Sequence, residues 1–483
     1  MGARKISVDE ISQHSSPEDC WIVVDGAVWD LTHFAPDHPG GAHIITQHAG
    51  HDASAAYNTV HDASLLAATL APADYKGQLD PSTVTSKWSN PQSNTISTPK
   101  TKDKPPLSTI LNAQDFESAA AHTVSQKTWA FYSSAATDCV TRERNVSFFS
   151  RIWLRPRVLC DVSGDVDMCT SMLGQRLDVP LYVAPAALAK LIHPEGEKAL
   201  ARGCMKTRIA QVISTNASFP VEAITASSPA TPFFFQLYVN KSRSATEQLL
   251  STIQSTTSIS ALWVTVDAPV PGKREADERV RADTSIGTPI SGQQATNDSR
   301  GGGLGRTMGS YIDASLSWSD IPWLRSIWHG RIVLKGIQSA ADAERAVAAG
   351  VDGIVVSNHG GRSLDTVAPA VMVLLELRLR CPRVFDKIEV YVDSGIRRGA
   401  DVVKCLCLGA KAVGMGRPFL YALNYGEEGV EKLVEVMRDE METTMRLLGV
   451  TSVKQLHPGL LNYRDVEHLV PEGRRWRWLS ARL

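Results

Sequence analysis

Eight short apolar runs follow one another through the second part of the chain, separated by stretches with helical spacing. The runs are continuous rather than alternating, which is typical of parallel strands buried on both faces. Intervening segments such as SAADAERAVAAG and RRGADVVKCLCLGA have the pattern of amphipathic helices. Together they predict an α/β TIM (β/α)8 barrel. The runs are PLYVAP (180–185), AQVIST (210–215), FFFQLYV (233–239), ALWVTVDAP (261–269), RIVLKGI (331–337), DGIVVSNHGG (352–361), IEVYVDSG (388–395) and AVGMGRP (412–418).

The first part of the chain has a different pattern. Short β-like runs in CWIVVDGAVWDL surround Asp25-Gly26, which predicts a tight hairpin turn. From residue 80 the composition changes to Ser, Thr, Pro, Asn and Lys, as in flexible linkers. We therefore expect a small α+β domain at 1–79, a linker at 80–106, the barrel domain at 107–465 and a C-terminal tail at 466–483.

One segment interrupts the rhythm of the barrel. Residues 284–310 are rich in Gly, Ser, Asn and Gln and have no periodicity, which predicts a mobile loop over the barrel mouth. Its RGGGLGR does not complete the G-x-G-x-x-G pattern, and no other stretch does. A dinucleotide-binding domain is therefore disfavoured.

Composition narrows the partners only slightly. The 483 residues carry a net charge of −1 and are 43% hydrophobic, an ordinary globular balance that gives no sign of nucleic acid or an anionic membrane. No apolar stretch approaches the roughly 18 residues of a membrane span, and no signal peptide is visible. We expect a soluble protein, cytoplasmic if Met1 is the native start and in the mitochondrial intermembrane space if a presequence has been removed.

Two histidines of the first domain have the spacing of an axial ligand pair. His38 precedes a Pro-Gly-Gly turn and His61 follows 23 residues later. Two imidazoles could fill both axial positions of a haem iron, and Gly40 and Gly41 would let the backbone approach the ring. The eight cysteines form no C-x-x-C-H motif, so such a haem would be held non-covalently. The alternatives are a His-rich surface, since His33, His43, His48 and His51 lie in the same region, and a zinc site with Cys20.

Polar residues follow several barrel strands at their carboxyl ends, where the active sites of such barrels lie. Lys335 ends RIVLKG, either as a rim residue or as a cation that stabilises a reduced cofactor such as a flavin. Asp267 ends WVTVDAP, and a bond from its carboxylate would orient His359 as a base. Alternatively, Asp267 only caps a turn.

Arginines supply candidate anion-binding groups. Arg362, three residues after His359, can present a bidentate fork to a carboxylate, and Arg274 could supply a second fork or be a surface residue. Arg397 and Arg417 follow the last two strands beside glycines, in the usual place of a barrel's phosphate site.

Both halves of the chain resemble known families. DCWIVVDGAVWDLTHFAPDHPGGAHII resembles a cytochrome b5 domain, which implies haem b with His38 and His61 as axial ligands. The segments SNHGGRSLD, VDSGIRRGADVVKCLCLGA and GMGRPFLY resemble the FMN-dependent L-2-hydroxy-acid dehydrogenase and oxidase family. The two together, in one chain, resemble the cytochrome-type L-lactate dehydrogenases.

The resemblance implies an oxidoreductase that converts an L-2-hydroxy acid, L-lactate or a relative, to the 2-oxo acid. It implies that His359 is the base, Asp267 its partner, and Arg362 and Arg274 the carboxylate ligands, with Tyr238 on the substrate hydroxyl. Electrons would pass from FMN to haem b and then to cytochrome c, in a homotetramer. FMN would contact Ala184, Pro185, Ala186, Ala187, Ser214, Gln236, Thr265, Lys335, Asp393, Ser394, Gly395, Ile396, Arg397, Gly416 and Arg417.

The sequence departs from the family at three positions. Phe131 in FYSSAA stands where a tyrosine hydroxyl usually contacts the substrate carboxylate, which predicts weaker lactate binding or a substrate that needs this bond less. Asn216 replaces an apolar pocket residue, and either meets a polar substituent of the substrate or points away from it. Ser394 replaces a glycine of the phosphate loop and could add a hydroxyl donor.

Two other functions compete with the dehydrogenase. An FMN-dependent oxidase would pass its electrons to oxygen, but the haem domain would then have no purpose. A haem electron carrier with a degenerate barrel has only Phe131 in its favour.

Overall fold

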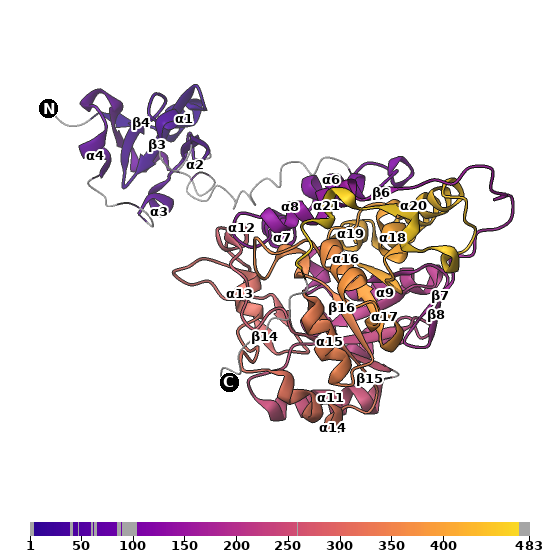
Figure 1. The fold of residues 1–483 in the computed structure, drawn as a ribbon. Helices are drawn as coiled ribbons and strands as arrows, with labels where there is room; N and C mark the ends of the chain where they lie inside the picture. The colour runs from indigo at the N-terminus through magenta and orange to yellow at the C-terminus, as the bar shows by residue number, and fades with distance from the viewer. Residues whose placement is uncertain are drawn as a thin grey trace. The chain divides into compact units, whose positions relative to one another are not determined.

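The computed structural model describes residues 4–38, 42–46, 48–58, 61, 65–84, 88, 104–257 and 259–472. The chain forms two compact units, residues 1–100 and 101–483, shown in Figure 1 from indigo to yellow along the chain. None of the described helices is long and apolar enough to cross a membrane.

The first unit is built on a five-stranded sheet with the strand order β1-β5-β4-β3-β2. Asp25 and Gly26 both have positive φ, 50° and 81°, in the turn that pairs Val24 with Ala27, which confirms the predicted hairpin. Alternate residues of β3 pack into separate apolar clusters on the two faces of the sheet. The strands are β1 (Lys5–Ile6), β2 (Ser15–Ser16), β3 (Asp19–Val24), β4 (Ala27–Asp30) and β5 (Tyr75–Leu79), and the helices α1 (Val8–Gln13), α2 (Ala42–Thr46), α3 (Ser54–Tyr57) and α4 (Leu65–Thr69).

The predicted linker begins with ordered residues. Pro81–Thr83 forms a 3₁₀ helix, and Trp88 is buried against the first unit, where its indole N–H donates to the carbonyl of Gly50 at 3.2 Å. A single tryptophan within a polar stretch is enough to extend the core of the small unit. Residues 85–87 and 89–103 lie outside the described residues, as do Gly40 and Gly41.

The second unit contains a closed barrel of eight parallel strands, which confirms the predicted TIM fold. Each predicted apolar run contains one strand. The strands are β9 (Leu181–Val183), β10 (Ala210–Ser214), β11 (Phe233–Leu237), β12 (Ala261–Thr265), β15 (Arg331–Ile337), β16 (Gly353–Val356), β17 (Glu389–Val392) and β18 (Ala412–Met415).

Large aromatic side chains fill the barrel interior. Tyr182, Phe234, Trp263 and Tyr391 are fully buried in one cluster, with the rings of Phe234 and Trp263 stacked at 6.0 Å. The interior is thus a packed core, and the cavity described below lies at the carboxyl ends of the strands.

Helices surround the barrel in Figure 1. Ser339 caps α15 by accepting from the amide of Asp342. The helices are α9 (Gly196–Thr207), α10 (Val221–Ala226), α11 (Arg243–Thr256), α14 (Ile321–Ile327), α15 (Ala340–Ala348), α16 (Ala370–Arg380), α17 (Val384–Lys387), α18 (Gly399–Cys407), α19 (Arg417–Leu423) and α20 (Gly426–Leu447).

The segments before and after the barrel proper add further elements. Those before it include α6 (Ala113–Thr123), α7 (Gln126–Ser133), α8 (Val140–Ser147), β6 (Trp153–Leu154), β7 (Thr170–Met172) and β8 (Gln175–Leu177), and those after it include β19 (Leu461–Asn462) and α21 (Arg464–Glu467). The start of α8 is attached to the loop after β16, because the Asp365 carboxylate accepts from the amides of Val140 and Thr141 at 3.2 and 2.7 Å.

The segment 284–310, predicted as a mobile loop over the barrel mouth, does contribute residues to the cavity at that mouth, but it is not without secondary structure. The segment contains a hairpin of β13 (Gly287–Thr288) and β14 (Gln293–Gln294) and the helix α13 (Leu304–Met308), and it follows α12 (Glu275–Glu278). Side chains supply its order: Asn297 exchanges two 2.9 Å hydrogen bonds with the backbone of Ala282, and Ala295 and Leu304 are buried. These anchors are too far apart in sequence to produce a periodic pattern.

Candidate active site

A cavity at the carboxyl ends of the barrel strands brings most of the predicted barrel residues together. Gly305, Met308 and Gly309, from the segment 284–310, form part of its wall. Of the predicted residues in this unit, Asp267 and Arg397 alone do not line the cavity. Those that do are Phe131, Ala184, Pro185, Ala186, Ala187, Ser214, Asn216, Gln236, Tyr238, Thr265, Arg274, Lys335, His359, Arg362, Asp393, Ser394, Gly395, Ile396, Gly416 and Arg417.

His359 lies between a buried carboxylate and a phenol. Its Nδ1 is 2.9 Å from Asp267 Oδ1, and its Nε2 is 3.2 Å from the hydroxyl of Tyr238. The Asp267 side chain is fully buried behind the ring, where Gly336, at φ +112°, leaves it room: a Cβ there would lie 2.5 Å from that of Asp267. A bond from Nδ1–H to Asp267 leaves Nε2, on the cavity side, as the acceptor of a proton.

Neighbouring positive charges keep the Asp267 carboxylate ionised. Burial by itself would raise the pKa of its carboxyl, but His359 and Lys335 outweigh it, so the pKa lies below its usual value. Burial raises the pKa of Tyr238 to about 12, and Tyr238 therefore stays a neutral donor.

Lys335 is a buried cation on the cavity wall. Its Nζ lies 3.4 Å from Asp393 Oδ2 and donates to the hydroxyl of Ser357 at 3.1 Å, and that hydroxyl donates to Asp393 Oδ1 at 2.5 Å. Burial alone would lower the pKa of Lys335, but Asp393 and Asp267 raise it above its usual value. The side chain therefore carries a fixed positive charge inside the barrel mouth.

Three polar side chains form a ladder across neighbouring strands. Ser214 donates to the Gln236 amide oxygen at 3.2 Å, and the amide nitrogen donates to the hydroxyl of Thr265 at 3.0 Å. All three side chains are buried and line the cavity.

Two guanidinium groups flank the ring of Phe131. The Cζ atoms of Arg274 and Arg362 lie 5.7 and 5.2 Å from its centroid. Arg362 donates to the carbonyls of Phe131, Tyr132 and Ser134 at 2.9, 3.0 and 3.1 Å. Burial lowers the pKa of both guanidinium groups, which nonetheless stay charged. A carboxylate bound in the cavity would contact the guanidinium groups of both arginines.

The two arginines after the last strands differ in placement. Arg417 lines the cavity and donates to the carbonyl of Gly360 at 2.6 Å. Arg397 instead points to α6, where its guanidinium forms a 2.7 Å ion pair with Glu117. Arg397 lies outside the cavity lining, and its contact with the phosphate stays a prediction.

The departures at Asn216 and Ser394 have partners within the protein. Asn216 lines the cavity, but its amide donates to the carbonyl of Met308 at 3.2 Å and accepts from the hydroxyl of Tyr311 at 3.3 Å. Ser394 has φ +85°, a conformation that favours glycine, and its hydroxyl accepts from the amide of Gly360 at 2.9 Å.

The polar groups that line the cavity suit FMN. The buried ladder and the Lys335 ammonium offer polar groups to a heteroaromatic ring and a positive charge to its reduced form. A Cβ on Gly416 would meet nothing within 4 Å, so this glycine keeps the wall open beside Arg417.

The two histidines of the first unit face each other, with ring centroids 6.1 Å apart and planes at 73°. Since a metal–imidazole bond is about 2 Å long, this separation leaves room for one ion between two ring nitrogens. Among the described residues no group of three or more His, Cys, Asp and Glu side chains could hold a metal ion. A haem fits His38 and His61, because its ring supplies the other ligands to the iron.

Ser357 and Tyr132 are among the residues of the site that the sequence patterns missed. Ser357 links Lys335 to Asp393, and its position directly after an apolar strand was a usable signal. Tyr132 donates to the carbonyls of Ala187 and Leu188 at 2.8 and 2.7 Å and so holds a cavity wall. Nothing in the sequence pattern indicates that contact.

Comparison with known proteins covers both units. The FMN-dependent dehydrogenase model matches residues 120–463, and the cytochrome b5-like Heme/Steroid binding domain model matches residues 7–80. The chain is 42% identical to the L-lactate dehydrogenase (cytochrome) of Saccharomyces cerevisiae over 96% of this chain and 80% of that protein. It is 39% identical to the glycolate oxidase of Spinacia oleracea over 72% of this chain and 94% of that protein.

A solved structure of a flavocytochrome b2 variant with pyruvate bound matches at a TM-score of 0.68 and 42% identity, covering 78% of this chain and 93% of that one. Both resemblances inferred from the sequence motifs are confirmed. The chain belongs to the FMN-dependent dehydrogenase family and carries a cytochrome b5-like domain in front of its barrel.

Proposed function

We propose that this protein oxidises L-lactate to the 2-oxo acid, with FMN as the first electron acceptor, haem b as the second and a cytochrome as the last. The observation that carries the proposal is His359, which lies between an ionised carboxylate and a neutral phenol in a cavity with two guanidinium groups. The homotetramer and the cellular compartment stay predictions from the resemblance.

The substrate carboxylate binds to Arg274 and Arg362. Both lie at the Phe131 end of the cavity, and each presents N–H groups that match a carboxylate. The hydroxyl-bearing carbon then lies near Tyr238 and His359, because these two residues line the same cavity as the two arginines. Their facing atoms are 3.2 Å apart, so one substrate hydroxyl can reach both.

His359 accepts one of the two hydrogens that leave the substrate, as a proton, and Tyr238 donates to the substrate hydroxyl. The Asp267 carboxylate stabilises the imidazolium that forms. When bound in the cavity, FMN would supply the acceptor for the two electrons and the other hydrogen, and haem b held by His38 and His61 would supply one-electron transfer to the external cytochrome. Lys335 supplies the positive charge that the reduced flavin needs.

The competing functions have less support. Glycolate oxidase matches the barrel portion alone, whereas the relative named for cytochrome matches nearly the whole chain. The electron-carrier hypothesis requires a degenerate barrel, but the base, the carboxylate forks and Lys335 all line one cavity or support it.

We expect L-lactate to reduce added ferricytochrome c faster than it causes oxygen consumption. The assay follows both acceptors with the same preparation, and His61→Ala is the matched variant. This variant should lose cytochrome c reduction but still reduce a small artificial acceptor, because the barrel cavity is untouched. Equal oxygen consumption in the two proteins, with no cytochrome c reduction by the native one, would favour the oxidase.

Substitution of the base should abolish most of the turnover. We expect His359→Gln to lower kcat by about 10²- to 10⁴-fold, the usual contribution of a general base. Asp267→Asn should lower kcat less and shift the acid limb of the kcat/KM profile to lower pH. The sign follows because the ionised Asp267 favours the imidazolium, so a neutral amide makes protonation of the ring harder. An acid limb that moves to higher pH would contradict this role.

Restoring the missing hydroxyl should tighten substrate binding. Phe131→Tyr adds a donor to a charged carboxylate, a bond worth about 1.5–3 kcal/mol. KM for L-lactate should therefore fall by about tenfold or more. Steady-state kinetics of the native protein and the variant test this prediction, and unchanged KM and kcat would refute it.

A further inference from the structure

The two arginines of the carboxylate site are anchored differently. Arg362 is held by three backbone carbonyls at the end of α7. Arg274 has no hydrogen-bond partner for Nε or Nη1 within the part of the chain that the structure describes. Its guanidinium must be held in place by what packs around it.

Two groups pack against Arg274. One is Gly305 in α13, where a Cβ would lie 2.3 Å from the guanidinium carbon, so any larger residue would displace the guanidinium. The other is the ring of Phe131, 5.7 Å from the same carbon. The position of Arg274 therefore depends on how α13 and α7 are joined.

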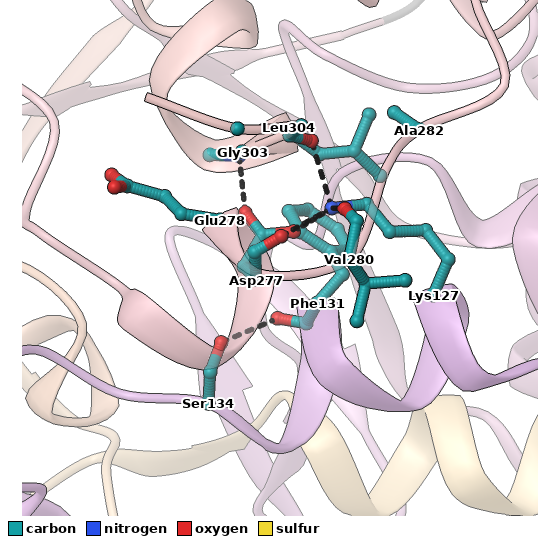
Figure 2. Close-up of polar contacts among 12 residues, drawn as sticks. Lys127, Phe131, Ser134, Asp277, Glu278, Val280, Ala282, Gly303 and Leu304 are labelled. Carbon is teal, nitrogen blue, oxygen red and sulfur yellow. Dashed lines mark hydrogen bonds and ion pairs between the residues drawn. The ribbon is translucent and has the colours of Figure 1, made fainter. Parts of the chain in front are cut away.

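Lys127 joins them, as Figure 2 shows. It lies four residues before Phe131 on α7, so both side chains project from one face of the helix. Its Nζ lies 2.6 Å from both the Oδ1 and the carbonyl oxygen of Asp277, 2.9 Å from the Val280 carbonyl and 2.8 Å from that of Gly302. An ammonium has only three hydrogens to share among these four oxygens.

Asp277 extends the link to α13. Its Oδ2 accepts from the amide of Gly305 at 2.9 Å, while its Oδ1 is bonded to Lys127. The carboxylate side chain is 1% exposed and that of Lys127 is 11% exposed. A buried pair of this kind is strongly destabilised when one partner is removed. The residues just after Arg274 and those just before α13 are thus fastened to α7 by one ammonium group.

We propose that Lys127 and Asp277 are positioning residues that hold Arg274 in place for the substrate carboxylate. Lys127 does not line the cavity itself and acts only through the segments it joins. The inference rests on the proposed function, because it takes the carboxylate ligand of Arg274 from that mechanism.

Kinetics of the full chain test the proposal. Lys127→Met should raise KM for L-lactate by about 10- to 100-fold, the loss expected when a substrate-binding group shifts by about 1 Å. The change in kcat should stay below about threefold, because the fork binds ground state and transition state alike. Lys127→Arg keeps the charge and should recover part of the loss.

A matched control separates positioning from stability. Lys404 is also buried, donates to a backbone carbonyl, that of Phe149 at 2.8 Å, and does not line the cavity. Lys404→Met should therefore leave KM unchanged. An equal rise in KM in both variants would overturn the proposal.

A double-mutant cycle tests whether Lys127 acts through Arg274. In an Arg274→Lys background, Lys127→Met should change KM by less than about twofold, because coupled residues are not additive. If Lys127→Met raises KM in this background as much as in the native protein, Lys127 does not act through Arg274. Hydrogen exchange gives a readout without turnover: amides of residues 302–309 should exchange faster in Lys127→Met, and unchanged exchange would contradict the proposed link.

The two proposals fail in different ways. A native protein that does not oxidise L-lactate would overturn the proposed function. Binding of oxalate, a dicarboxylate probe, followed by flavin absorbance, would still test the positioning role. Oxalate should bind more weakly to Lys127→Met than to the native protein by the factor seen in KM, and equal affinity would overturn the role of Lys127.

Discussion

The active site depends on one buried ammonium group, that of Lys335, among carboxylates at the ends of neighbouring strands. Buried charges are tolerated only when they are paired. Lys335 on β15 pairs with Asp393 after β17, and the charges of Asp393 and of Asp267 after β12 raise the pKa of Lys335 above its usual value. Without this cation, the fully buried Asp267 would lose part of what keeps it ionised, and His359 would lose its partner. The pairing of β12, β15, β16 and β17 side by side in the barrel therefore also assembles the base, because it brings these strand ends together.

The substrate side of the cavity depends on a different element, α7, which precedes the barrel. Its last carbonyls hold Arg362, its Phe131 ring lies beside both guanidinium groups, and its Lys127 fastens the segment that follows Arg274. The barrel strands thus supply the groups that handle the proton and the cofactor, whereas α7 organises the groups that bind the carboxylate.

Much of this arrangement could be predicted because parallel strands buried on both faces leave continuous apolar runs. All eight runs contain a strand, and polar residues at their carboxyl ends, such as His359 and Lys335, line the cavity. Two features depend on contacts that a local sequence pattern does not contain. Order at 284–310 comes from single long-range anchors, and Arg397 is drawn away by Glu117, a residue 280 positions earlier in the chain. Lys127 was missed for the same reason, because its acceptors are carbonyls about 150 to 175 residues away.

The most direct test of the account follows both redox centres in one rapid mixing experiment. The full chain, loaded with FMN and haem, is mixed with L-lactate without oxygen, and the flavin and reduced-haem absorbance bands are recorded together. The account predicts that the flavin bleaches first and that the reduced-haem band then rises at the expense of the reduced flavin. A flavin that L-lactate leaves oxidised, or a haem that stays oxidised after the flavin has bleached, would contradict it.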